Sequence, residues 1–115
     1  MAMKGKTQGI AVAVVVAVGL AGCSLTLPVT GQLQNSSETF EGSATGHLDR
    51  SGELTVTTSK GVQCNGTFVY VDARTGKGTF RCGDGRSGPF EFVSTGQHGT
   101  GQGDLGGEHF TFTFG

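Results

Sequence analysis

The sequence has little of what several classes of protein need. Its 115 residues include 8 basic and 9 acidic side chains, which gives a formal net charge of −1, and no basic patch. Aromatic and basic residues do not interleave as in a groove that stacks bases, so no nucleic-acid partner is expected. The sequence also lacks a phosphate-loop motif, a Gly-x-Ser-x-Gly motif and clustered carboxylate pairs. We therefore predict that the protein is not an enzyme and has no cofactor.

Long hydrophobic runs are scarce as well. One run, Ile10–Leu20, contains eleven residues, and as a helix it would span about 16 Å. Because the hydrocarbon core of a bilayer requires about 20 apolar residues, the run is too short for a stable transmembrane helix. Lys4 and Lys6 precede it. This arrangement is typical of a signal peptide, which we place at residues 1–22.

The signal segment ends in Leu20-Ala21-Gly22-Cys23, which resembles the lipobox of bacterial lipoproteins. The resemblance implies that the Cys23 thiol receives a diacylglyceryl group and that cleavage falls between Gly22 and Cys23. A thiolate is the strongest nucleophile among the side chains. The mature protein would be held in the cell envelope by membrane lipid at acylated Cys23. Ser24 follows the cysteine where inner-membrane lipoproteins of the resembling kind have Asp, which favours the outer membrane.

Two cysteines remain after Cys23, namely Cys64 and Cys82. An even number in an exported, oxidising compartment predicts a disulfide between them. The alternative, a thiol metal site, lacks CxxC spacing and nearby histidines. Closing a loop of this length restricts the unfolded chain by about 3 kcal/mol. Such a constraint matters for a small domain with a thin hydrophobic core.

Beyond the cysteine the chain divides into two parts. Residues 23–38 are rich in Ser, Thr, Gln and Asn with almost no charge, which predicts a lipid-anchored flexible linker. From residue 39 the apolar period becomes two, as at Leu54 and Val56, which indicates half-buried strands. Turns are expected at residues 50–52, 59–61, 74–76, 84–85 and 94–96. We predict an all-β, glycine-rich domain over 39–115. Its six or seven strands would form an antiparallel meander, as a curled single sheet or a small sandwich.

The cysteine pair also predicts the register of one hairpin. If Cys64 lies opposite Cys82, the hairpin is centred on Ala73. Phe68 then faces Gly78 and Phe80 faces Gly66, so that each ring covers a residue without a side chain. A bulge would shift this register by one residue.

The same stretch contains a weak repeat. Gly66-Thr67-Phe68 recurs as Gly88-Pro89-Phe90, and each copy is followed by a Gly-x-Gly. Over about residues 64–107 this pattern resembles a MORN repeat, in which glycines lie opposite aromatic residues of a hairpin. The resemblance implies a scaffold of stacked hairpins and no catalytic activity.

Several polar residues are candidates for a metal or acid–base site. They are His47, Asp49, His98, Asp104, Glu108 and His109. No two of them have ligand spacing on one element, so we predict no metal site there. The glycine-rich segment 99–108 matches the calcium β-roll pattern poorly. It is more simply interpreted as a glycine-rich strand and a tight turn.

The last residues end in Phe110, Phe112 and Phe114, with threonine between them. They favour a final strand that packs its rings in the core. The alternative is an edge strand that docks on a partner by strand addition.

The sequence supports two candidate functions, which belong to different classes. The first is a cell-envelope lipoprotein of structural or interaction type, which binds an envelope protein or the cell wall. The alternative is a module that binds a small ligand or a metal ion such as calcium, using segment 99–108 and nearby histidines.

Overall fold

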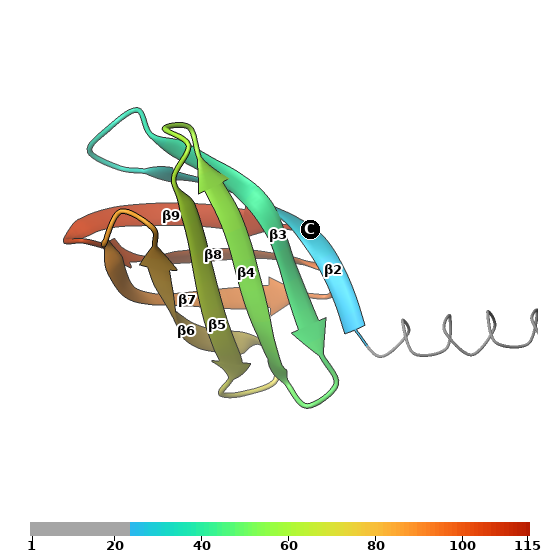
Figure 1. Cartoon of the computed structure of the whole chain (residues 1–115). Helices are drawn as coiled ribbons and strands as arrows, with labels where there is room; N and C mark the ends of the chain where they lie inside the picture. The colour runs from blue at the N-terminus through green and yellow to red at the C-terminus, as the bar shows by residue number, and fades with distance from the viewer. Residues whose placement is uncertain (1–23) are drawn as a thin grey trace, which may run out of the picture.

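The protein is an antiparallel β-barrel. In a computed structural model, which describes residues 24–115, these residues form eight strands that follow one another around a closed barrel (Figure 1). The strands are β2 (Ser24–Leu33), β3 (Thr39–His47), β4 (Ser51–Thr58), β5 (Gln63–Tyr70), β6 (Thr75–Cys82), β7 (Ser87–Thr95), β8 (His98–Leu105) and β9 (Glu108–Phe114). The expected all-β antiparallel meander is confirmed, and a closed barrel is the more specific description than a curled sheet or a small sandwich. The chain from Ser24 onward contains no helix long and apolar enough to cross a membrane.

Strand β2 closes the barrel, because it pairs with β3 on one side and with β9 on the other. The expectation of a flexible linker over residues 23–38 is therefore wrong for Ser24–Leu33, which belong to the β domain that the sequence predicts only from residue 39. The physical reason is the burial of Val29 and Leu33, which are 0 % and 2 % exposed. Pro28 is tolerated because it lies just past the last β9 pair, and its carbonyl accepts a hydrogen bond from Gly115 N at 3.0 Å.

The last strand is not an edge strand. β9 pairs with β8 along its whole length and with β2 from Phe110 to Phe114. Phe110 and Phe112 are buried and Phe114 packs against the core. The core-packing interpretation of these phenylalanines is thus confirmed, and strand addition at β9 is excluded because its backbone is already paired.

The barrel interior is built from phenylalanine rings that lie over glycines. Each ring leans onto a glycine of the preceding strand, where a Cβ would come within about 3 Å of it. The pairs are Phe40 on Gly31, Phe68 on Gly52, Phe80 on Gly66, Phe90 on Gly78, Phe92 on Gly76, Phe110 on Gly103, Phe112 on Gly101 and Phe114 on Gly99. Gly52 and Gly76, which the sequence places in turns, therefore lie inside strands. Glycine leaves room for the rings, which meet edge to face within the barrel.

The β5–β6 hairpin has the expected register. Cys64 pairs with Cys82, Phe68 with Gly78 and Phe80 with Gly66, and the two sulfurs form a disulfide. Phe80 covers Gly66 as expected. Phe68 instead covers its other partner, Gly52, and the ring over Gly78 is that of Phe90. The segment that resembles a MORN repeat forms β5 to β8 of the barrel.

The two ends of the barrel differ. At one end, called here the closed end, lie the loops 34–38, 59–62, 83–86 and 106–107. At the other, called the open end, lie the turns 48–50, 71–74 and 96–97, the start of β2 and the C-terminal Gly115 (Figure 1).

Candidate functional site

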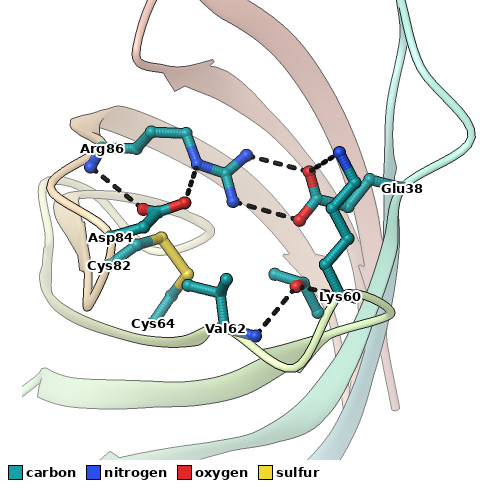
Figure 2. The surroundings of a disulfide bond; sticks show 8 residues. Glu38, Lys60, Val62, Cys64, Cys82, Asp84 and Arg86 are labelled. Carbon is teal, nitrogen blue, oxygen red and sulfur yellow. Dashed lines mark hydrogen bonds and ion pairs between the residues drawn. A yellow bond between two sulfur atoms is a disulfide. The ribbon is translucent and has the colours of Figure 1, made fainter.

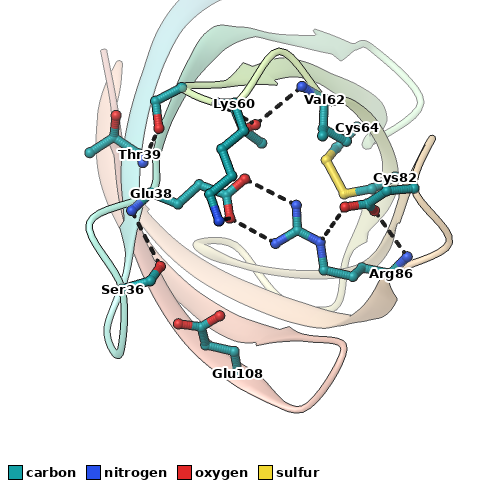
Figure 3. Close-up of polar contacts among 12 residues, drawn as sticks. Ser36, Glu38, Thr39, Lys60, Val62, Cys64, Cys82, Arg86 and Glu108 are labelled. Carbon is teal, nitrogen blue, oxygen red and sulfur yellow. Dashed lines mark hydrogen bonds and ion pairs between the residues drawn. A yellow bond between two sulfur atoms is a disulfide. The ribbon is translucent and has the colours of Figure 1, made fainter.

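The closed end is sealed by an ion pair across the barrel. Glu38, from the loop after β2, is 3 % exposed and points toward Arg86, from the loop after β6 (Figure 3). The Arg86 guanidinium donates two hydrogen bonds to the Glu38 carboxylate, at 2.9 and 3.0 Å. Its Nε donates to Asp84 at 2.8 Å, next to the disulfide (Figure 2). This bidentate geometry is the strong form of the interaction.

The charges at the closed end satisfy one another. Hydrogen bonding to Arg86 is the main cause that lowers the pKa of Glu38, and the same contact raises the pKa of Arg86. Lys60 adds a second cation 4.0 Å from the carboxylate. Below this layer a void of only about 10 Å³ remains among the buried side chains, no more than the space that a single water molecule needs. We conclude that the closed end is a structural plug and offers no entrance.

The open end contains a cavity of about 370 Å³ inside the barrel. Apolar side chains make up most of its lining. They are Leu25, Leu27, Ala44, Leu48, Leu54, Phe68, Tyr70, Phe92, Phe112 and Phe114. The cavity exists because β9 ends at Phe114, opposite Val29, so the first residues of β2 have a neighbouring strand on one side only. The volume lies in the range of small-molecule sites, about 300–1,000 Å³.

The cavity has two different walls. On the side of β2 to β4 it is aliphatic, with Leu27, Ala44 and Leu54. On the side of β5 and β7 it is aromatic, and the Phe92 ring stands edge to face against Phe68 and Tyr70, at centroid distances of 5.0 and 5.4 Å. A flat apolar molecule between these walls would contact aliphatic side chains on one face and the edges of aromatic rings on the other.

Polar groups lie near the mouth. The Tyr70 hydroxyl donates to Ser94 Oγ at 3.2 Å, and Ser94 Oγ in turn donates to the Arg74 carbonyl. The Arg50 guanidinium lies over the Tyr70 ring, 4.8 Å from its centroid. His47 Nε2 lies 2.9 Å from a Glu53 carboxylate oxygen. These side chains at the mouth can therefore contact a polar group of a ligand whose apolar body lies deeper in the cavity.

The polar residues that the sequence singles out do not come together. His47 and His98 lie at the open end, whereas Asp104 and His109 face each other at 3.7 Å between β8 and β9. Asp49 is engaged by Ser51, and Glu108 by the Asn35 amide. Within residues 24–115, no three His, Cys, Asp or Glu side chains are grouped to hold a metal ion. Segment 99–108 forms the β8–β9 hairpin and no separate site.

Several cavity residues are missed by the sequence analysis. Leu25 and Leu27 belong to the segment interpreted as a linker, although they alternate with polar residues up to Leu33. That period of two was the available signal. Ala44 and Leu48 carry no signal of their own, because their position at the mouth depends on the closure of the barrel.

A larger hollow of about 1050 Å³ is less suited to a ligand. Its lining is mainly threonine, glutamine and glutamate from the outward faces of the strands, including Thr30 and Thr113, whose hydroxyls bond each other at 3.2 Å. Such side chains are already solvated or paired, so we take the smaller apolar cavity as the candidate site.

Comparisons with known proteins concern the fold alone. No family model matches this chain, and no curated protein matches it in sequence. Two similar solved structures are a redesigned β-barrel, mFAP1, bound to DFHBI, and a fluorescence-activating β-barrel designed de novo. The first has a TM-score of 0.63 at 15 % identity and covers 77 % of this chain and 90 % of that one. The second has a TM-score of 0.60 at 12 % identity and covers 77 % and 88 %.

Proposed function

We propose that this protein binds a small, mainly apolar molecule in the cavity at the open end of its barrel. The observation that carries the proposal is the contrast between the two ends. One end is filled and sealed by Glu38 and Arg86, and the other holds about 370 Å³ of apolar space. Eight-stranded barrels are just wide enough to hold one small ligand. A binding role is favoured over catalysis because, within residues 24–115, no hydroxyl of the lining is hydrogen-bonded to a histidine: His47 bonds Glu53 and the Tyr70 hydroxyl bonds Ser94.

The two walls of the cavity suggest the class of ligand. A flat aromatic or alicyclic body would fit between Leu54 and Phe92, and a polar substituent would lie at the mouth of the cavity near Tyr70. The similar structures support this proposal, because one of them, a barrel of similar fold, is bound to DFHBI.

A dye titration tests the proposal. The neutral apolar dye N-phenyl-1-naphthylamine should bind the wild-type protein saturably at one site. Ala44→Trp should fill the cavity and weaken binding by about tenfold or more, since an occupied pocket offers no apolar surface to the dye. Thr55→Trp is the matched control, because Thr55 is exposed on β4 directly beside Leu54. Equal dye binding by both variants, with unchanged melting temperatures, would overturn the proposal.

The anchoring expected from the sequence is part of the proposal. We infer an envelope lipoprotein in which acylated Cys23 holds the barrel at a membrane, in the outer membrane by the identity of Ser24. The intact mass of the membrane-extracted protein should show loss of residues 1–22 and addition of lipid, and Cys23→Ser should remove both changes. An uncleaved wild-type chain with a free Cys23 thiol would contradict it. A protein partner in the envelope would then contact loops or outer strand faces, because the β9 backbone is already paired.

A further inference from the structure

The large apolar side chains exposed on the barrel lie toward one end. Among the described residues, five such side chains have between 45 % and 78 % of their surface exposed. They are Leu25, Leu48, Val69, Val71 and Val93, called here the apolar rim. Leu48 and Val71 lie in turns of the open end, Leu25 is the second residue of β2, and Val69 and Val93 are within two residues of strand ends there. None of the five lies at the closed end, whose loops carry Glu38, Lys60, Asp84 and Arg86 (Figure 2).

The residue that follows the predicted lipid attachment in the sequence lies at this same end. Strand β2 begins at Ser24, and Cys23 is the residue bonded to it. Consecutive Cα atoms are about 3.8 Å apart. Because β2 starts directly after Cys23, no linker separates the predicted acyl chains from the barrel.

We propose that the apolar rim docks on a phospholipid bilayer, with the open end of the barrel turned toward the lipid. A surface of exposed leucine and valine is stabilised when it enters the interface between headgroups and acyl chains. Leu48 and Val71 enter first. Val69 follows two residues further along β5, about 7 Å at the rise of a strand, which matches the depth of about 5–10 Å typical of interfacial segments.

Charge at the open end does not select anionic lipid. The turns carry Asp49, Arg50, Asp72 and Arg74, two charges of each sign. Both aspartates accept hydrogen bonds from their own turns, and Arg50 donates to the Asp72 carbonyl. Docking should therefore occur on zwitterionic phosphatidylcholine and should change little with salt, unlike attraction to an anionic surface.

This inference rests on the anchoring proposed at Cys23 and does not depend on ligand binding. The chain has no tryptophan, so a single introduced tryptophan reports its own surroundings. Leu48→Trp and Val71→Trp place the reporter on the apolar rim, and Val71 lies outside the cavity lining. Ser37→Trp is the matched control, because Ser37 is an exposed residue in a loop of the closed end.

The three variants of the mature lipid-anchored protein are reconstituted in phosphatidylcholine vesicles that contain brominated acyl chains. Both rim tryptophans should show blue-shifted emission, and bromine should quench them roughly two- to threefold more strongly than the control, because they reach the acyl region. Equal quenching of all three would overturn the proposal. So would a blue-shifted tryptophan in Val71→Trp that bromine does not quench, because a second copy of the chain or another protein would then cover the apolar rim. Dye binding by Ala44→Trp is measured in a separate experiment, and its outcome does not change the interpretation of the bromine quenching.

Discussion

Substitution of interior glycines tests how the barrel is packed and where it is empty. Gly101 and Gly46 both face the barrel interior, from β8 and β3. A Cβ at Gly101 would come within 2.3 Å of the Phe112 ring and 2.7 Å of the Glu91 carbonyl oxygen. A Cβ at Gly46, which lines the cavity, would meet nothing within 4 Å. The same methyl group is therefore added once to a filled site and once to open space.

The expected effects have opposite signs. Overpacking a filled core costs about 1–3 kcal/mol, and replacing glycine with alanine returns about 0.4–1 kcal/mol by restricting the unfolded chain. Gly101→Ala should thus lose about 1–2 kcal/mol, which lowers the melting temperature by about 5–15 °C for a domain of this size. Phe112 has no room to move aside, since it is 3 % exposed and packs against Phe90. Gly46→Ala keeps only the favourable term and should melt at the same temperature as wild type or a few degrees higher.

Thermal unfolding followed by circular dichroism, with all three proteins in one detergent, measures both shifts. If the two variants melt at the same temperature, ring contact does not explain the glycines and the open end is not empty. Such a result would refute the packing described here and the cavity together.

Three further predictions concern the polar contacts and the disulfide. Removal of the disulfide in the double variant Cys64→Ser and Cys82→Ser, whose sequence separation is 18, should lower the free energy of unfolding by about 3 kcal/mol; an unchanged urea midpoint would contradict this. Glu38→Gln should cost about 2–3 kcal/mol at pH 7, because a largely buried charged hydrogen bond to Arg86 is lost. The folded pKa of Glu38 lies below its ordinary value of 4.5, so its contribution is present above pH 4.5 and is lost as pH falls through the folded pKa. The difference in urea stability between wild type and Glu38→Gln should therefore shrink in acid, and a constant difference would argue against the ion pair. Tyr70→Phe should cost about 1 kcal/mol through loss of the bond to Ser94, and no change would mean that water replaces the bond.

The hairpin of β5 and β6 shows what the sequence was able to predict. Its register follows from two local facts, namely the pairing of two cysteines and the period of two, and it places glycines opposite phenylalanines. These constraints act within about twenty residues, so they are visible in the sequence. The direction in which the Phe68 ring leans is not visible in the sequence. Phe68 has a glycine on each neighbouring strand, and only the packing of the closed barrel determines whether the ring covers Gly52 or Gly78.

Strand β2 shows where the prediction failed. The polar composition of the segment predicts a linker. The alternation of apolar with other residues, at Leu25, Leu27, Val29 and Leu33, is the signal of the strand that the structure shows. The strand is stabilised by partners at the far end of the sequence, since Val29 pairs with Phe114. Closure of the barrel therefore could not be derived from local pattern.

The features that define the candidate site depend on that closure. Glu38 and Arg86 are 48 residues apart and meet only because their loops cross the same end of the barrel. The cavity arises from the unequal lengths of β2 and β9 at the other end. Neither length can be predicted from composition. The sequence therefore predicts small-ligand binding only as an alternative, at segment 99–108, which does not line the cavity.

The central claim is that the apolar cavity at the open end takes a small ligand. Amide chemical shifts of the isotope-labelled protein, titrated with N-phenyl-1-naphthylamine, test it most directly. We predict saturable shifts at Ala44, Leu54 and Phe92, with Glu38 and Cys82 at the closed end unchanged. Shifts confined to outward-facing residues such as Thr30 and Thr113, or shifts that never saturate, would contradict the account.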